Sequence, residues 1–170
     1  MIFTDWSGVA FRVHDPRWAY DPLSGKGAAT HGGRANRPGI NALYLSTTIE
    51  TAIAEYRQLD ALLQPALIVS YRISVAQIVD FTCGYNSTWE NLWQDFFCDW
   101  RKLKFNDGVE PPSWAIGDHV LATGGKGIMF RSALSDGANL VLFPDFFTDS
   151  DLIRVHDPNF CLPKNQNSWL

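Results

Sequence analysis

An arginine that follows two glycines is the most suggestive feature of this sequence. The stretch reads His31-Gly32-Gly33-Arg34-Ala35-Asn36. Glycine lets a backbone approach a ligand closely or turn with a positive φ, and a guanidinium can grip a phosphate with paired, charge-assisted hydrogen bonds. The stretch therefore predicts a site for an anionic ligand, with His31, Gly33, Arg34 and Asn36 as candidate contacts. His31 would either touch the ligand or cap a turn.

Three residues farther along the chain could complete such a site. Tyr44 lies in an apolar run, Glu55 on a predicted amphipathic helix, and Ser132 after a glycine-rich turn and a second apolar run. A carboxylate such as Glu55 can stabilise positive charge that develops in a transition state. Ser132 lacks the elbow motif of a hydrolase nucleophile and is expected to make a polar contact instead. Taken singly, Tyr44 could equally be a core residue and Glu55 a solvated helix flank.

The elements that must position these residues are short strands with helices between them. Apolar, β-branched runs predict strands at Val9–Val13, Ala42–Ser46, Ala66–Ser74, Ile78–Phe81, Ile128–Phe130, Asn139–Phe143 and Leu152–Val155. The alternation is too irregular for a doubly wound sheet, so we expect a mixed α+β fold with a sheet core and inserted helices. The polar, glycine-rich stretch between residues 14 and 41 is expected to be a long functional loop.

The first predicted helix follows a capping-box pattern at Thr47-Thr48-Ile49-Glu50, with Thr47 as its cap. Its apolar face would comprise Ile49, Ala52, Ile53 and Tyr56. Glu55 lies on the flank of that face, where a side chain can line a cleft.

Two more helices are expected in the second half of the chain. The pattern Ser87-Thr88-Trp89-Glu90 predicts a helix start, followed by a series of large apolar residues, Leu92, Trp93, Phe96, Phe97 and Trp100. Their spread predicts burial on more than one side or contact with a partner through Trp93 or Trp100. A shorter helix is predicted over Trp114–Ala122.

Length and composition restrict the class of protein. A chain of 170 residues that is 46% hydrophobic can bury one sizeable core, so we expect a single domain over residues 1–170. A net charge of −4 argues against direct binding of nucleic acid. Three cysteines at unrelated spacings suggest neither disulfides nor a metal site. With no membrane-length apolar segment and no leader, the sequence predicts a cytoplasmic protein that needs no membrane.

Several separated motifs, in this order along the chain, resemble one known family. They are Phe11-Arg12, Asp21-Pro22-Leu23-Ser24-Gly25, Gly27-Ala28-Ala29, His31-Gly32-Gly33-Arg34-x-Asn36, Ala42-Leu43-Tyr44-Leu45, Ala54-Glu55, Gly127-Ile128 through Ser132, and Asn139-Leu140-Val141-Leu142-Phe143. This series looks like the RES-domain family, which is named for an arginine, a glutamate and a serine. Arg34, Glu55 and Ser132 match those three, and the resemblance spans about residues 11–143.

The resemblance implies the toxin of a bacterial type II toxin–antitoxin pair, with a fold similar to that of ADP-ribosyltransferase toxins. Such a toxin degrades NAD at the nicotinamide–ribose bond, with water or phosphate as acceptor, and arrests growth. NAD would be a substrate, with no cofactor and no metal. The alternatives are a mono-ADP-ribosyltransferase that modifies a cellular protein and an inactive module that only binds the antitoxin. The implied partner is an Xre-type helix-turn-helix antitoxin that covers the active site, and self-association into a homo-oligomer within that complex stays open.

The resemblance also implies roles for individual residues. Arg34, Tyr44, Glu55 and Ser132 would be catalytic: Glu55 would bond a ribose hydroxyl, Arg34 the pyrophosphate, and Tyr44 and Ser132 the nicotinamide-ribose end. His31, Gly33 and Asn36 would join Arg34, Tyr44 and Ser132 in binding the substrate.

Two positions depart from the family pattern. The family often has an aromatic residue where this chain has Ala35, and a basic residue shortly after the serine, where this chain has Ala133-Leu134. Either departure would reshape a wall of the site.

Overall fold

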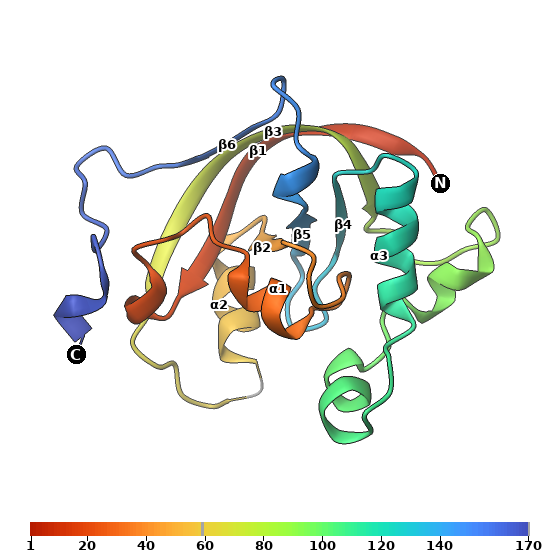
Figure 1. The fold of residues 1–170 in the computed structure, drawn as a ribbon, viewed down its shortest axis with the longest axis horizontal. Coiled ribbons are helices and arrows are strands. Elements are labelled where there is room, and N and C mark those ends of the chain that lie inside the picture. The colour runs from red at the N-terminus through yellow and green to blue at the C-terminus, as the bar shows by residue number, and fades with distance from the viewer. Residues whose placement is uncertain (59, 170) are drawn as a thin grey trace.

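The computed structural model describes residues 1–58 and 60–169. Within this part of the chain, six strands form one sheet in the order β1-β2-β5-β4-β3-β6, and β1 also pairs with β3, which closes the sheet into a barrel-like shape (Figure 1). The strands are β1 (Phe3–His14), β2 (Leu43–Ser46), β3 (Leu67–Phe81), β4 (Gly127–Arg131), β5 (Ala138–Leu142) and β6 (Leu152–Val155). The pairing of β3 with β4 is parallel and the other pairings are antiparallel. The predicted mixed α+β class is confirmed.

Strands β1 and β3 are longer than the sequence predicts. They pair from Phe3 opposite Val79 to His14 opposite Leu67, so the predicted Val9–Val13 strand is only part of β1. The two strands predicted over residues 66–81 form one continuous strand, β3. Gln77 within it has a φ of 58°, and this irregularity lies where the neighbour of β3 changes from β6 to β4. The polar Gln77 interrupts the hydrophobic pattern without ending the strand.

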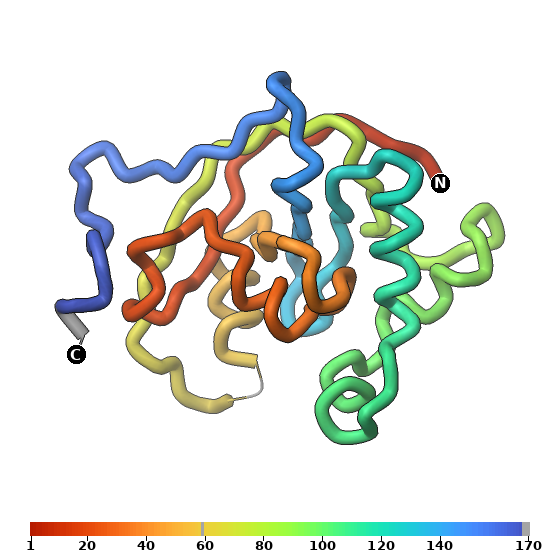
Figure 2. The backbone as a smooth tube through the Cα atoms, viewed as in Figure 1, coloured from red at the N-terminus to blue at the C-terminus, as the bar shows by residue number. Residues whose placement is uncertain are grey.

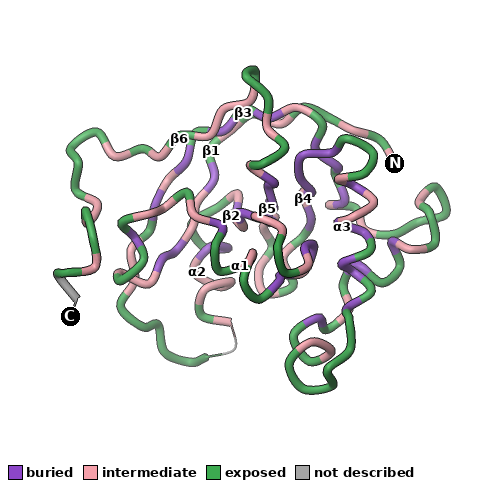
Figure 3. The backbone as a smooth tube through the Cα atoms, in the orientation of Figure 1, coloured by how far each residue is buried: buried purple, intermediate pink, exposed green. Residues whose placement is uncertain are grey.

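The hydrophobic core lies on both faces of the sheet. Side chains alternate between the faces of a strand, and in β5 Val141 belongs to one buried cluster while Leu140 and Leu142 belong to the other. The first cluster packs under helix α3 (Ser113–Ala122) and the aromatic segment before it (residues 89–100), and the second fills the space between β3 and β5. Figure 3 shows the buried residues concentrated in the strands and α3, with exposed residues in the outer loops.

Three α-helices accompany the sheet within the described residues: α1 (Lys26–His31), α2 (Ile49–Arg57) and α3 (Ser113–Ala122). Helix α3 agrees with the prediction, and α1 interrupts the stretch expected to be a loop. The chain from residue 15 to 41 crosses in front of the sheet (Figure 2). None of the described helices is long and apolar enough to cross a membrane.

Helix α2 forms where predicted but is capped by a different residue. Thr48, not Thr47, accepts a hydrogen bond from the Thr51 amide at 3.2 Å. The Thr47 hydroxyl instead donates to the Ala138 carbonyl at 3.1 Å, because Thr47 continues the pairing of β2 with β5. Of the predicted apolar face, Ala52 is buried, whereas Ile49 is 40% exposed.

The predicted helix that starts at Ser87 is wrong. The segment holds a 3₁₀ turn at Asn91–Asp95 and a π-helical turn at Lys102–Asn106. The Asn86 side chain accepts from the Thr88 amide at 2.9 Å and forms a local turn where the cap was expected. Trp93 and Phe96 are buried around Phe81. The turn at Asn86 and the short 3₁₀ and π-helical turns take the place of a continuous helix, and the chain bends as it brings these aromatic residues to the sheet.

Candidate active site

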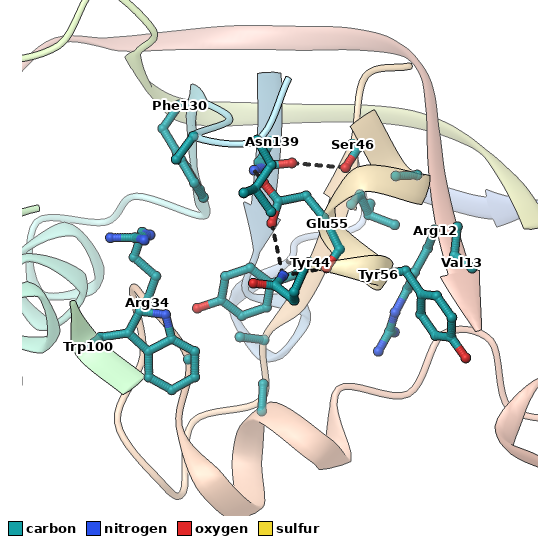
Figure 4. A pocket seen from close by; sticks show the side chains of 18 of the residues that line it. Arg12, Val13, Arg34, Tyr44, Ser46, Glu55, Tyr56, Trp100, Phe130 and Asn139 are labelled. Atoms are coloured by element: carbon teal, nitrogen blue, oxygen red, sulfur yellow. Dashed lines mark hydrogen bonds between the residues drawn. The ribbon is translucent and has the colours of Figure 1, made fainter. Parts of the chain in front are cut away.

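A cavity of about 460 Å³ opens between the glycine loop (residues 32–36), helix α2 and strands β1, β2 and β5. This volume lies in the range of small-molecule sites. Figure 4 shows Glu55 and Asn139 at its centre, with Arg34 and Trp100 on one side and Arg12 and Tyr56 on the other. The cavity thus gathers side chains from the first third of the chain, the aromatic segment and β5.

The carboxylate of Glu55 is held through one of its two oxygens. Its Oε1 accepts hydrogen bonds from Ser132 Oγ at 2.8 Å and from Asn139 Nδ2 at 2.6 Å. Asn139 is oriented in turn by Ser46, whose hydroxyl donates to the amide oxygen at 2.9 Å. The other oxygen, Oε2, has only the amide of Gln58 at 3.5 Å among the described residues. One carboxylate oxygen is therefore left to accept a hydrogen bond from a ligand.

The hydroxyl of Ser132 is hydrogen-bonded within the protein. This hydroxyl donates to Glu55 and accepts from the Leu134 amide at 3.0 Å, so its one proton is used within the protein. Ser132 accordingly positions the carboxylate, and a direct contact to substrate stays a prediction. Leu134 itself lines the cavity where the family often has a basic residue, and Arg101 and Arg131 also line it.

The N-terminus of α2 is tied to the loop between β4 and β5, and this fixes the helix that carries Glu55. The hydroxyls of Thr51 and Ser135 lie 2.8 Å apart, and Thr51 also bonds Thr48 at 2.8 Å. The backbone of that loop closes through the Ser132 amide, which donates to the Gly137 carbonyl at 2.9 Å. The carboxylate and its donor Ser132 are thus set on two elements that hold each other.

Arg34 faces the cavity but is also bound to the aromatic segment. Its Nη1 donates to the carbonyl oxygens of Phe96 at 3.0 Å and Cys98 at 3.1 Å, and its guanidinium lies over the Phe97 ring. These carbonyls are available because the segment is not a regular helix. Burial lowers the pKa of Arg34 from its usual value, and the nearby Cys98 and Tyr44 oppose this shift.

The glycine loop is held by a buried asparagine and a half-buried tyrosine. Asn36 donates through Nδ2 to the carbonyls of Ala28, Arg37 and Ile40, at 3.0 to 3.1 Å. The Tyr44 hydroxyl donates to Asn36 Oδ1 at 2.8 Å and accepts from the Ala35 amide at 2.9 Å. Burial raises the pKa of Tyr44, so its hydroxyl keeps the proton it donates. Only the ring of Tyr44 is left to meet a ligand.

Packing within the protein accounts for the glycines of this loop as much as contact with a ligand does. Gly32 has a φ of 81°, which favours glycine. A Cβ on Gly33 would collide with the Tyr44 hydroxyl and with Asn36 Oδ1, and the Gly33 carbonyl accepts from Trp114 Nε1 at 2.7 Å. Ala35 is fully buried and its carbonyl lies against Gly117, so the aromatic residue of the family would not fit without rearrangement.

His31 does not line this cavity. It lies at the end of α1 and lines a second cavity of about 540 Å³ beside the first. The structure thus brings Gly33, Arg34, Tyr44 and Glu55 around one cavity, with Ser132 and Asn36 behind them as supports.

Arg12 is a candidate site residue that the sequence analysis missed. It lines both cavities, donates through Nη1 to the Ser24 carbonyl at 3.0 Å, and makes no ion pair among the described residues. Burial lowers its pKa. A signal was present in the sequence: alternation places Arg12 on the same face of its strand as buried Ala10, and an arginine facing inward calls for a partner.

Charge sets the kind of ligand this cavity can take. Among the described residues that line it, the cations are Arg12, Arg34, Arg101 and Arg131, and the carboxylate is Glu55. No group of histidine, cysteine, aspartate or glutamate in the described part of the chain could hold a metal ion. The cavity suits an anionic ligand that carries a hydroxyl for Glu55.

Comparisons with known proteins agree with this arrangement at the level of the family. The profile described as the RES domain matches residues 9–165. The fold is similar to a chain in the crystal structure of the M. tuberculosis MbcT–MbcA toxin–antitoxin complex, with a TM-score of 0.59 and 21% identity over 89% of this chain and 84% of that one. No curated protein is a significant match to the sequence.

Proposed function

Because this chain belongs to the RES-domain family, we propose that it is the toxin of a toxin–antitoxin pair and that it cleaves NAD between nicotinamide and ribose. The observation that carries the proposal is the single carboxylate, with one oxygen free, in a cavity whose other charged residues, among those described, are arginines. NAD carries the groups that this cavity can bind, namely a pyrophosphate for the cations and ribose hydroxyls for the carboxylate. The family resemblance supplies the choice of NAD among such ligands.

In the proposed complex the nicotinamide ribose lies against Glu55. The free Oε2 accepts a hydrogen bond from a ribose hydroxyl, while Oε1 stays bound to Ser132 and Asn139. Arg12 takes the pyrophosphate, since Arg34 already donates to two carbonyl oxygens. Arg34 and the Tyr44 ring form the wall around the nicotinamide end.

The reaction breaks the bond between ribose C1′ and the pyridinium nitrogen. The electron pair of that bond returns to the ring, so nicotinamide leaves as a neutral molecule and needs no general acid. A glycosidase needs a second carboxyl group for this purpose. Glu55 stabilises the oxocarbenium-like charge that develops on the ribose. Water or phosphate then attacks C1′ through oxygen and gives up a proton, which yields ADP-ribose or its phosphate ester at that same carbon.

The test is chromatography of the products after the purified chain is incubated with NAD, with and without phosphate. We expect free nicotinamide, and Glu55→Gln should reduce its release at least about 100-fold, the size of effect typical of a lost transition-state contact. Glu50→Gln is a matched control, because Glu50 is an exposed carboxylate on the same helix. Unchanged release by Glu55→Gln would overturn the mechanism, and no release by the intact chain would overturn the activity.

We also propose that the barrel-like sheet is related to the ADP-ribosyltransferase toxins and that the toxin acts on the cytoplasmic NAD pool. An Xre-type antitoxin would restrain it by covering the mouth of the cavity. Phe97, which is 45% exposed and lines that mouth, is the better candidate contact within the aromatic segment. Trp93 is 1% exposed and belongs to the core, which argues against the partner contact expected through Trp93. Trp100 is buried at the cavity wall.

The partner is tested by measuring nicotinamide release as antitoxin is added to the purified toxin. We expect inhibition at a stoichiometric ratio, weakened by Phe97→Ala but not by Tyr85→Ala, which removes an exposed ring that lines neither cavity. An antitoxin that binds while release continues would contradict a covered cavity.

A further inference from the structure

The second cavity is not used by the chemistry at Glu55. It lies between the end of β1, the turn Pro16–Trp18 and helix α1, and it shares Arg12, Val13, Gly27 and Tyr56 with the first cavity. Its volume of about 540 Å³ also fits a small-molecule site. We propose that this second cavity binds the adenosine half of NAD, with Arg12 on the pyrophosphate between the two cavities. The assignment rests on the proposed function.

Arg12 links the two cavities chemically as well as in space. Its guanidinium makes one hydrogen bond, to the Ser24 carbonyl, and lies beyond 4 Å of every carboxylate in the described part of the chain. A largely buried cation without a counter-charge favours an anion from solution. The carboxylates that line the second cavity, Asp15 and Asp21, are paired with Arg17 and Lys26, so they oppose a phosphate less than free acids would.

A buried histidine offers a hydrogen-bond acceptor to the second cavity. His14 is 5% exposed, and its Nε2 lies 2.7 Å from the Tyr71 hydroxyl. That hydroxyl donates to the Pro22 carbonyl at 2.8 Å, so the proton shared with His14 must belong to Nε2. Burial, reinforced by nearby Arg12, lowers the pKa of His14 to about 3, and the ring is neutral at pH 7.

A neutral ring protonated on Nε2 leaves Nδ1 as an acceptor. Among the described residues Nδ1 has no hydrogen-bond partner, and it is not one of the fully enclosed unpaired atoms. His14 lines the second cavity. The exocyclic amine of adenine and the hydroxyls of its ribose are donors that such an atom would accept from. Because Nδ1 carries no proton, it cannot donate a hydrogen bond to an anionic group.

Aromatic side chains complete the second cavity. Trp18 is 56% exposed and Tyr20 37% exposed, and both line the cavity together with Tyr56. Exposed rings at the rim of a cavity suit the flat face of a nucleobase, because stacking needs no particular base. The second cavity therefore presents the three features of a nucleoside site: aromatic faces, a neutral acceptor and a cation at the phosphate end.

The test compares two substrates that share the scissile bond. NAD reaches the second cavity, whereas nicotinamide mononucleotide lacks the adenosine. We expect Tyr20→Ala and Trp18→Ala each to raise the KM for NAD about ten-fold, to leave kcat unchanged, and to leave cleavage of the mononucleotide unchanged. Tyr85→Ala is the matched control, since Tyr85 is 39% exposed and lines neither cavity. Equal effects on both substrates, or no effect on either, would overturn the assignment.

Calorimetric binding of ADP separates this inference from the proposed function. The Glu55→Gln variant should bind ADP. Adding Tyr20→Ala to this variant should weaken ADP binding about ten-fold, whereas adding Tyr85→Ala should not. If the wild-type chain leaves NAD intact but ADP binding follows this pattern, the activity is wrong and the nucleoside site stands. If NAD is cleaved but neither rim variant changes ADP binding, the activity stands and the nucleoside site is wrong.

Discussion

The carboxylate of Glu55 works through the two side chains that hold it. Removing the hydroxyl in Ser132→Ala takes away one of the two donors to Oε1, which frees the carboxylate to turn away from the ribose. We expect kcat for nicotinamide release to fall about 10- to 100-fold, since small displacements of a catalytic group have effects of this size, with KM little changed. Ser87→Ala removes an exposed hydroxyl elsewhere and should leave kcat unchanged. A higher KM with kcat intact would instead place Ser132 on the substrate.

The two arginines that flank Glu55 should respond differently to substitution. Arg12→Gln removes a cation that has one backbone partner, so the KM for NAD should rise while the melting temperature stays nearly constant. Arg34→Gln removes charge-assisted bonds to the Phe96 and Cys98 carbonyls and should lower the free energy of unfolding by about 1–3 kcal/mol. Denaturant unfolding and initial-rate kinetics on both variants separate the two roles. Equal losses of stability would contradict this division.

Individual residues differ in how well their roles in the site can be predicted from the sequence. Glu55 is recognised as a cavity residue because helical periodicity places it beside an apolar face. The role of Asn139 as its donor could not be inferred, since the two residues are 84 positions apart and only the pairing of β2 with β5 sets their distance. His31 was grouped with Arg34 by proximity in the chain, but the turn at Gly32 sends it to the second cavity.

At the level of elements, the glycine loop is a packed unit. Gly33→Ala would push a methyl group into the Tyr44 hydroxyl and Asn36, breaking the bonds that brace the loop. We expect a loss of about 1–3 kcal/mol in the free energy of unfolding together with a lower rate of NAD cleavage. Gly27→Ala is the contrasting control for stability, because a Cβ there meets nothing within 4 Å in helix α1; it should stabilise by up to about 1 kcal/mol. Thermal unfolding compares them, and an unchanged melting temperature for Gly33→Ala would refute the packing argument.

Elements with a single periodic apolar pattern could be predicted, and those without one could not. Helix α3 and strands β2, β4, β5 and β6 appear close to their expected ranges. The aromatic segment could not be predicted because Trp93, Phe96 and Phe97 all pack around Phe81, a contact that the sequence pattern does not specify. The capping-box pattern at Ser87-Thr88-Trp89-Glu90 favoured a helix, but the Asn86 side chain forms a local turn there instead.

For the molecule as a whole, stability should fall as the pH is lowered below neutrality. His14 binds a proton only near pH 3 in the folded chain and near 6.5 when unfolded. Between these values the unfolded state holds more protons, so the free energy of unfolding decreases with falling pH, by at most about 1.4 kcal/mol per unit from this group. Asp151, whose pKa is lowered to about 2 by Lys126 and backbone amides against the effect of burial, adds to the loss only below about pH 4.

Urea unfolding of the wild type and of His14→Gln between pH 4 and 7 tests this dependence. Glutamine can keep the donor to Tyr71 but takes up no proton, so its stability curve should be flatter over this range. Parallel curves would show that other groups govern the acid sensitivity.

The closure of the sheet depends on pairing between distant parts of the chain, and no local sequence pattern predicts it. Strands β1 and β3 pair residues more than fifty positions apart, and the length of both strands follows from that pairing. The fold class was predictable from the mixture of elements, whereas the closed shape, and with it the inward direction of Arg12 and His14, follows from long-range pairing.

The long reach of the hydrogen bonds at Glu55 also bears on how such a protein is made. Synthesis proceeds from the N-terminus at about 5–20 residues per second, and Glu55, Arg34 and Arg12 emerge well before Ser132 and Asn139, the donors that orient the carboxylate. A nascent or truncated chain that ends before β5 therefore lacks the donor Asn139, and under the proposed function it would not cleave NAD. Under the same proposal, the antitoxin would be needed only once β5 has left the ribosome.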